Sequence, residues 1–294
     1  MRRLLALSIA LVALIAAGCG GEEEATPTAA GTGTTAANPC AKDQLTLKTP
    51  GQLTIGTDNP AFPPWFEDAN GAPWDPTTEP TKRGYEAAVA YAVAGKLGFS
   101  DEEVKWTVVP FDNAFKPGPK DFDFDINQVS YTEKRDRAVD FSDSYYDVQQ
   151  AVVTLKSSQY ANATSLADLH GAKLGAPVGT TSFDVIESTI QPGVDAAVFN
   201  TLNDAISALK NGQVDGIVTD LPTAFFVTAV QVPKGTIVGQ VAANTQEHFG
   251  LVFEEGNPLR DCVNQALSSL RDDGTLDSIE QEWLADKADA PVLR

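Results

Sequence analysis

The amino-acid sequence predicts an α/β protein with two similar lobes, and three observations lead to this fold class. From Gln52 onward, strand-like and helix-like segments alternate, which favours α/β layers with mostly parallel sheets. The chain has 294 residues, enough for two medium-sized domains. Residues 111–128 and 199–220 also echo each other: each begins at a phenylalanine, passes a glycine and enters a strand that contains an aspartate. Two related α/β lobes would produce this echo.

The elements give the order of the lobes along the chain. The first lobe is expected at 51–147, the second at 148–244, and the chain then returns to the first lobe at 245–294. Strands are expected at 52–58, 104–110, 122–128 and 149–156. Helices are expected at 84–99, from about 181 to 190, between 199 and 212, between 257 and 274, and after that to Leu284. Pro117 and Pro119 should cut short the helix that follows Phe111.

The N-terminus has the three regions of an export signal. Arg2 and Arg3 precede an uncharged apolar run, and small residues follow it up to Cys19. The residues before this cysteine resemble the lipobox of bacterial lipoproteins, in which the signal is cut off and the cysteine is lipidated. We therefore expect a signal peptide at 1–18 and lipidation of Cys19, which would anchor the protein to a membrane. The alternative is an ordinary signal peptide that ends near a cysteine.

Residues 19–50 begin with a stretch rich in Ala, Thr and Gly that has almost no large apolar side chain. Such a stretch cannot bury enough surface to offset its ordering entropy, so we expect a flexible tether. Cys40 and Cys262 are the other cysteines of the chain. In an exported protein they are expected to form a disulfide, the alternative being two separate buried thiols.

Charge and motifs exclude several classes of function. The formal net charge of -19 argues against nucleic acid as a partner, because no basic face could follow its phosphates. Of the two histidines, His170 and His248, neither has a metal-ligand or nucleophile partner at local spacing. No catalytic motif stands out. We therefore expect no enzyme activity, no cofactor and no metal site.

Three features at strand ends together suit a zwitterionic ligand. A strand passes through Gly179 into a helix that starts near Thr181, where free N–H groups would attract an anion. Arg135 follows another strand and offers a planar fork for a carboxylate. Asp220 ends a third strand and could hold an ammonium group. Taken singly, each has an ordinary explanation, as a helix N-cap or as a solvated charge.

Five segments carry a resemblance to a known family. They are "LTIGTDNPAFPPWFE", "INQVSYTEKRDRAVDFSDSYY", "GAPVGTTS", "NGQVDGIVTD" and "VNQALSSLRDDGTLDSIEQEW". From about Gln52 to Trp283 the chain resembles the amino-acid-binding, family 3 solute-binding proteins of ABC transporters. The resemblance implies the two-lobed periplasmic-binding (Venus flytrap) fold, with two α/β lobes joined by a two-strand hinge.

The resemblance also implies which residues hold the charged groups of the ligand. Arg135 would bind the ligand α-carboxylate with help from Ser130, and the backbone at Gln128 would contact one of the α-groups. Thr180 and Thr181 would supply further donors. Asp220 would bind the α-ammonium group.

The ligand side chain would meet a second set of residues. The resemblance implies that Phe62 stacks on the ligand, with Trp65 as the other candidate in that loop. Phe111 would be the second aromatic wall, and Asp58 would contact the side chain itself. The insertion at 67–84 is longer than is usual and would bring Trp74 near the mouth of the cleft.

The side chain of the ligand stays open. Asp58, Glu67 and Asp125 favour a cationic amino acid, whereas Asn127 and Gln128 suit an amide equally well.

The function implied is that of a monomeric receptor that captures a free polar amino acid and delivers it to the permease of an ABC transporter. It would be exported and anchored by lipid to the outer face of the bacterial cytoplasmic membrane, or lie in the periplasm. Two alternatives remain: a dehydratase of the cyclohexadienyl or prephenate type on the same fold, and a lipoprotein that senses amino acids.

Overall fold

The structure is a computed structural model, and it describes residues 38–242, 247–285 and 290–294. The expected export signal, the lipidation site Cys19 and the tether up to residue 37 lie outside the described residues, as does the expected lobe boundary at 244. None of the helices in the three described ranges combines the length and apolarity that a membrane span needs.

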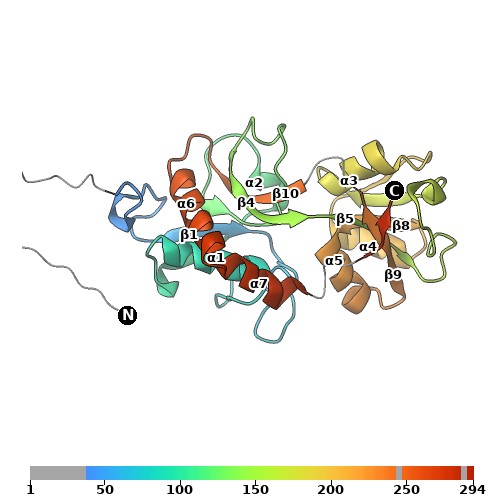
Figure 1. Ribbon diagram of the computed structural model, residues 1–294, viewed down its shortest axis with the longest axis horizontal. Coiled ribbons are helices and arrows are strands. Elements are labelled where there is room, and N and C mark those ends of the chain that lie inside the picture. Colours follow the sequence, from blue (N-terminus) through green and yellow to red (C-terminus); the bar gives the residue numbers. More distant parts are fainter. Residues whose placement is uncertain (1–37, 243–246, 286–289) are drawn as a thin grey trace, which may run out of the picture. The chain divides into compact units, whose positions relative to one another are not determined.

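The first sheet has the strand order β2-β1-β3-β10-β4, and β1, β10 and β4 are labelled in Figure 1. Its strands are β1 (Leu53–Thr57), β2 (Val104–Val108), β3 (Phe124–Asp125), β4 (Asp140–Val148) and β10 (Glu247–Phe253). β1 runs parallel to β2 and β3, and β10 runs antiparallel to β3 and β4. The helices of this part are α1 (Tyr85–Lys96), α2 (Phe111–Ala114), α6 (Leu259–Asp272) and α7 (Thr275–Leu284). We call residues 38–148 and 247–285 lobe 1.

The second sheet has the strand order β11-β9-β5-β8-β6-β7. Its strands are β5 (Gln150–Leu155), β6 (Leu174–Pro177), β7 (Ala197–Phe199), β8 (Gly216–Asp220), β9 (Gly235–Val241) and β11 (Val292–Leu293). Its helices are α3 (Thr181–Val185), α4 (Leu202–Lys210) and α5 (Leu221–Phe226); α3 and α5 each continue into a π-helical turn. We call residues 149–242 and 290–294 lobe 2.

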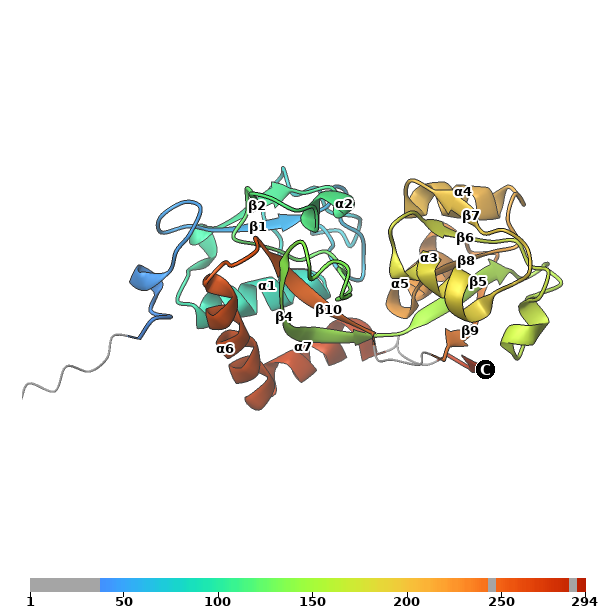
Figure 2. The same cartoon turned by 90° about the horizontal axis from the view of Figure 1, so that it is seen from above.

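The expected fold class is confirmed, with one difference in the sheets. β5 runs antiparallel to both β8 and β9, so the sheets are mixed rather than mostly parallel. The reason is visible in Figure 2, where β4 leaves the first sheet and continues directly into β5 of the second. Because β5 enters the second sheet from the other lobe, it runs antiparallel to the strands on either side of it.

Each sheet packs apolar side chains on both of its faces. In lobe 1, α1, α6 and α7 cover one face, and α2 with the segment around Val129 and Val139 covers the other. In lobe 2, α4 and α5 cover one face and α3 covers the other. The helices predicted at 84–99, before Gly212, after Asn257 and up to Leu284 are confirmed as α1, α4, α6 and α7. The strand predicted at 122–128 is shorter, with β3 at Phe124–Asp125.

The C-terminus corrects the expected lobe assignment. Residues 245–294 were expected to stay with the first lobe, but Val292 and Leu293 pair with β9 in the second sheet. The edge of β9 leaves backbone groups to be satisfied, and the N–H of Gln240 donates to the Pro291 carbonyl at 2.7 Å. Gly239 permits this approach, because a Cβ there would lie 2.6 Å from the Pro291 oxygen. The chain therefore passes between the lobes a third time, in addition to the two expected hinge strands.

The last part of the expected tether is folded. Cys40 and Cys262 form a disulfide with an S–S distance of 2.05 Å, which ties the start of the described chain to α6. Lys42 lies 2.6 Å from Glu103, and the N–H of Lys48 donates to the Asp123 carboxylate at 2.7 Å. The tether prediction is therefore wrong for residues 38–50, because polar contacts and the disulfide hold this segment against lobe 1.

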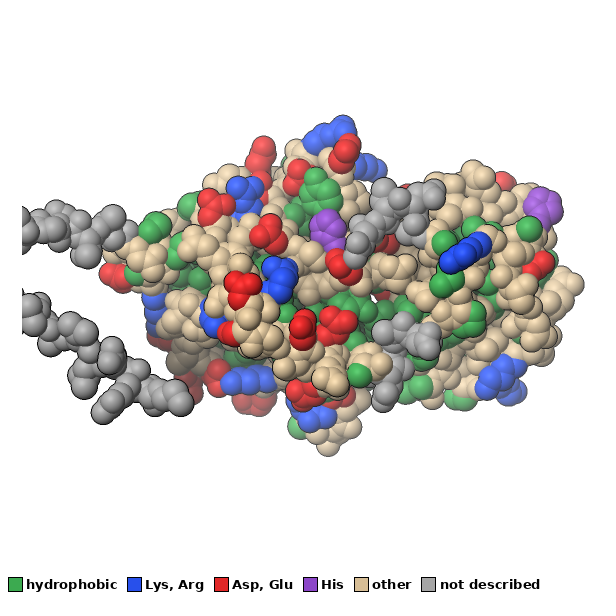
Figure 3. All heavy atoms as spheres, in the orientation of Figure 1, with side chains coloured by type: hydrophobic (Ala, Val, Ile, Leu, Met, Phe, Trp, Pro, Cys, Tyr) green, Lys and Arg blue, Asp and Glu red, His purple; other side chains and the backbone are tan. Residues whose placement is uncertain are grey.

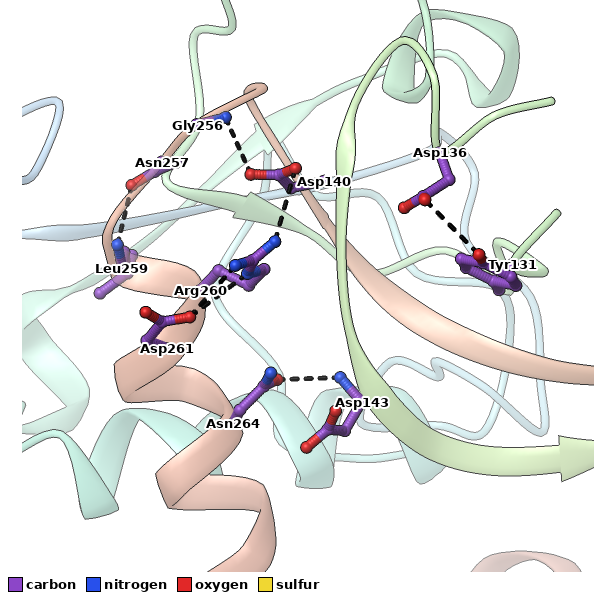
Figure 4. Close-up of polar contacts among 10 residues, drawn as sticks. All are labelled: Tyr131, Asp136, Asp140, Asp143, Gly256, Asn257, Leu259, Arg260, Asp261 and Asn264. Atoms are coloured by element: carbon purple, nitrogen blue, oxygen red, sulfur yellow. Dashed lines mark hydrogen bonds and ion pairs between the residues drawn. The ribbon is translucent and has the colours of Figure 1, made fainter. Parts of the chain in front are cut away.

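The N-terminal end of α6 docks on β4 through polar contacts (Figure 4). Just before the helix, the Asn257 side chain accepts a hydrogen bond from the Leu259 N–H at 3.0 Å. Arg260 lies 3.6 Å from Asp140, and Asn264 accepts from the Asp143 N–H at 2.9 Å. These contacts fix α6 on the strand that leads out of lobe 1.

Charged side chains of both signs are interspersed on lobe 1 over the face in Figure 3. Lobe 1 also has ion pairs between separate segments: Lys96 of α1 lies 2.7 Å from Asp273, and Lys48 lies 2.6 Å from Glu254. Exposed pairs of this kind add little stability. Because charges of both signs are interspersed, this face of lobe 1 has no continuous basic patch (Figure 3).

Candidate functional site

A cavity of about 430 Å³ is lined by residues of both lobes. This volume is typical of sites for small molecules. Nine of the ten residues predicted to bind ligand line this cavity, namely Asp58, Phe62, Trp65, Phe111, Gln128, Ser130, Thr180, Thr181 and Asp220. The tenth, Arg135, does not belong to the wall.

Strand ends explain how residues so far apart in sequence meet here. Asp58 directly follows β1, Asp220 is the last residue of β8, and the turn after β6 leads into α3. β1 runs parallel to β3, and β6 runs parallel to β8, so within each sheet the carboxyl ends of these strands open on one edge. In open α/β sheets this edge is where ligands bind.

The start of α3 contributes hydroxyl groups to the cavity. The Thr180 hydroxyl accepts from the Phe183 N–H at 3.2 Å and donates to the Pro177 carbonyl at 2.8 Å, so it caps the helix. The Thr181 hydroxyl lies 3.3 Å from that of Ser130 in the other lobe. Thr180 is therefore the ordinary N-cap that the sequence also allowed, whereas Thr181 faces the opposite lobe.

Arg135 lies beside the cavity and joins the two lobes. Its side chain is buried, with one nitrogen donating to the Ser130 carbonyl at 2.7 Å and another to the Gly179 carbonyl of lobe 2 at 2.8 Å. Its guanidinium carbon lies 4.3 Å from the centre of the Phe115 ring and 5.5 Å from that of Phe111. Burial lowers the pKa of Arg135, and Glu247 is the acid that opposes this most.

The two basic residues next to Arg135 in the sequence differ from it in burial. Lys134 and Arg137 are exposed, and Arg137 forms only a loose pair with Glu133 at 3.9 Å. Arg135 does not belong to the cavity wall, and each of its terminal nitrogens donates to a backbone carbonyl; its contact with a ligand stays a prediction. The Gly179 carbonyl thus accepts a hydrogen bond from the guanidinium that was expected to bind the ligand carboxylate.

Asp220 faces the cavity beside a second acid that the sequence analysis missed. Gln150 donates from its side-chain nitrogen to Asp220 at 2.7 Å and, more weakly, to Glu247 at 3.2 Å. Glu247 also accepts from the Ser130 hydroxyl at 2.6 Å. Burial first, and then repulsion from Glu247, raises the pKa of Asp220 to about 8. The two acids share one amide donor, so they repel each other when both are ionised.

Position in the sequence was the signal that could have found these two residues. Gln150 is the first residue after the crossing from β4 to β5, and Glu247 is the first residue of β10 after the crossing back. Residues at such crossings lie where the lobes meet. Neither residue belongs to a recognisable motif.

Gln128 forms hydrogen bonds to a buried carboxylate inside lobe 1. Its N–H donates to Glu86 of α1 at 2.7 Å, and its side-chain nitrogen donates to the same carboxylate. The Tyr145 hydroxyl is the third donor to Glu86. The N–H of Gln128 is thus bonded within lobe 1, and the expected ligand contact through its backbone stays a prediction. Gln128 has a backbone φ of 48°, which few residues other than glycine adopt easily. The hydrogen bonds to Glu86 stabilise this conformation.

Aromatic side chains form one side of the cavity. Phe62 and Phe111 line it, and Trp65 also packs edge-on against Tyr146 and Phe249. The Trp65 indole donates to the Thr223 hydroxyl of lobe 2 at 2.9 Å, which is another contact between the lobes.

The Trp74 side chain does not line the cavity, although the Trp74 backbone pairs with Ala61, which does. It is buried and stacks on Phe66 with ring centroids 5.7 Å apart, and it also meets Trp106 edge-on at 5.1 Å. The insertion at 67–84 folds back on lobe 1 because this indole fills an aromatic cluster. Among the described residues no group of three or more acids, histidines or cysteines could hold a metal ion.

The fold and the site define a class of protein: a two-lobed receptor that encloses a small polar solute between its lobes. The comparisons with known proteins give the family. Residues 53–286 match the family of bacterial extracellular solute-binding proteins, family 3. The match covers most of the chain, and the protein belongs to this family.

Three similar proteins illustrate the relationship. The chain is 26% identical over 243 residues to the L-cystine-binding protein TcyJ of Escherichia coli, covering 81% of this chain and 84% of that protein. The solved structure of an ancestral arginine-binding protein bound to glutamine is 33% identical, with a TM-score of 0.65 over 80% of this chain and 98% of that one. The ancestral amino acid-binding protein AncCDT-1, a precursor of cyclohexadienyl dehydratase, is 27% identical, with a TM-score of 0.63 over 79% of this chain and 95% of that one.

Proposed function

We propose that this protein captures a free polar amino acid between its lobes and delivers it to the permease of an ABC transporter. The observation that carries the proposal is the cavity itself, whose wall combines Asp220 with the start of α3 from lobe 2 and Ser130 from lobe 1. These groups suit an ammonium and a carboxylate on one small molecule. The relatives named for cystine and arginine support the same ligand class.

In the proposed complex Asp220 binds the α-ammonium group. Thr181 and Ser130, which face each other across the lobes, hold the α-carboxylate. Arg135 joins them by turning one nitrogen from the Gly179 carbonyl to the carboxylate, which is the stronger acceptor because it is charged. The ligand thus replaces contacts that already join the lobes, and it stabilises the closed arrangement by satisfying both lobes at once.

Binding rather than catalysis is the proposed activity. AncCDT-1 shows that this fold has a relative on the way to a dehydratase. Here, however, Gln150 donates to both acids near the proposed ammonium site, and Ser130 donates to Glu247, which suits a fixed binding wall. We also propose that the protein acts outside the cytoplasm as a monomer and is anchored by lipid at Cys19. Changing Cys19→Ser should move the protein from the membrane fraction to the soluble fraction.

A thermal-shift screen against the free amino acids tests the proposed function. A ligand at about 100 times its Kd stabilises the folded state by about 2.7 kcal/mol, which raises the melting temperature by several degrees. Prephenate is assayed in parallel for conversion to phenylpyruvate. A protein that no amino acid stabilises, or that converts prephenate, would refute the proposal.

A further inference from the structure

The charge of the cavity wall identifies the class of amino acid, given the proposed function. Three carboxylates line the cavity: Asp58 and Asp112 from lobe 1, and Asp220 from lobe 2. Among the described residues that line it there is no lysine, arginine or histidine. Behind Asp220, Glu247 adds a fourth acid through the shared amide of Gln150.

The nearest positive charge can offset only part of the negative charge of these acids. Within the described part of the chain, Arg135 is the cation whose charge acts on Asp220, and its terminal nitrogens donate to backbone carbonyls. A zwitterionic amino acid brings one positive and one negative charge, so its α-groups leave the balance unchanged. If the site closed around a neutral side chain, the half-buried Asp58 would therefore stay without a counter-charge beside the carboxylate of Asp112, which is costly.

Asp58 and Asp112 lie together, apart from Asp220. Repulsion from Asp112 contributes to raising the pKa of Asp58, although burial is the larger cause. Asp58 is half-buried at the end of β1, where it accepts from the Asn59 N–H at 2.7 Å. Asp112 is exposed at the start of α2, and one of its oxygens lies 3.4 Å from where a Cβ of Gly179 would be. Asp112 thus lies where lobe 1 meets lobe 2, at the rim of the cavity.

The residues that favoured an amide ligand are less suited to it than the sequence suggested. The Gln128 side chain is engaged by Glu86. Asn127 lines the cavity and is buried, and its amide nitrogen has no hydrogen-bond partner. An unpaired buried donor costs about 1–3 kcal/mol, so this site is built for a ligand that supplies an acceptor such as a carboxylate.

Two acids that seemed to favour a cationic ligand are not available either. Glu67 lies 2.7 Å from Arg83 and does not line the cavity. Asp125 is fully buried beneath Gly56, with both oxygens unpaired, and is also absent from the wall. The choice of ligand therefore depends on Asp58 and on Asp112, which the sequence analysis did not single out.

We infer that the site takes an amino acid with a cationic side chain, whose charge lies against Asp58 and Asp112 while its α-ammonium group lies against Asp220. The aromatic rings of Phe62 and Phe111 line the same cavity. Such rings attract cations and stack on a planar guanidinium group. Arginine is therefore the ligand expected to bind most tightly.

Calorimetry with matched pairs of ligands tests this inference. Citrulline has nearly the shape of arginine without its charge, and norleucine replaces lysine in the same way. We expect arginine to bind at least about tenfold more tightly than citrulline, since a fully paired charge contributes more than 1.4 kcal/mol. Citrulline or glutamine binding as tightly as arginine would overturn the inference and leave the proposed function intact. If no amino acid binds, the proposed function itself fails.

Variants locate the charge that discriminates. Replacing both residues, Asp58→Asn and Asp112→Asn, should reduce the preference for arginine over citrulline by about tenfold and change citrulline affinity little. Asp195→Asn is the matched control, because Asp195 is exposed outside the cavity and its loss changes the net charge equally. A double variant that keeps the preference would overturn the assignment. The wild-type comparison decides the ligand class even if the variant folds poorly.

Discussion

Glu86 and Asp220 are two buried or half-buried acids on opposite lobes, and the difference between them separates a structural acid from a binding one. Glu86 is completely buried and has three donors from its own lobe. Asp220 faces the cavity and has one donor, which it shares with Glu247. Burial raises both pKa values, to about 7 for Glu86 and to about 8 for Asp220. A shift in pKa alone therefore does not mark a ligand site, whereas unused acceptor capacity facing a cavity does.

Removing the Asp220 charge should have the largest effect. In Asp220→Asn the ligand ammonium loses its counter-charge, and we expect affinity for the amino acid to fall by about 100-fold or more. The fold should remain, because the side chain faces the cavity and Gln150 can still bond to the amide. Calorimetry measures the affinity, and circular dichroism checks the fold. Affinity close to wild type would show that Asp220 is as structural as Glu86.

Arg135 gives the next largest effect. Arg135→Ala removes the proposed carboxylate contact and the hydrogen bond to Gly179, and affinity should fall by about 30-fold or more. Arg137→Ala is the matched control, since that side chain is 78% exposed and pairs only with Glu133. If both variants bind the amino acid equally well, Arg135 does not bind the ligand.

The pH dependence of binding tests the protonation of Asp220. Only the ionised carboxylate attracts an ammonium group, so affinity should rise with pH up to about 8 and then level off. The rise can reach at most about tenfold per pH unit. Asp220→Asn should remove this dependence. The charged groups that act on Asp220 are Glu247, Glu86 and Arg135. Glu86→Gln should therefore change the midpoint only slightly.

The sequence predicted the positions of the site better than its contacts. Asp58 and Asp220 follow from a simple rule, because both lie at strand ends. The contacts of Arg135 and Gln128 could not be predicted, since the Gly179 carbonyl and the Glu86 carboxylate come from segments 44 and 42 residues away. The return of β11 to lobe 2 was missed because a two-residue strand has no period to detect. Gln150 and Glu247 were missed because single polar residues at crossings carry no pattern.

The smallest effect on binding, and the sharpest test of the comparison, is expected from Glu86. The native pKa of about 7 lies above the ordinary value of 4.5, so between these pH values the folded protein holds a proton that the unfolded chain has lost. The free energy of unfolding should therefore fall as pH rises through this range, by at most about 1.4 kcal/mol per unit.

Glu86→Gln removes this titration. It also places an amide nitrogen among donors, which should destabilise the fold by about 1–3 kcal/mol at pH 5. The destabilisation should shrink towards pH 8, where the wild-type carboxylate is ionised and costly. Urea unfolding at both pH values measures it, with Glu133→Gln on the exposed surface as the control. Affinity for the amino acid should change by no more than about threefold, because the Glu86 carboxylate has all its contacts within lobe 1. A variant that keeps its stability but loses binding would reverse the roles assigned to Glu86 and Asp220.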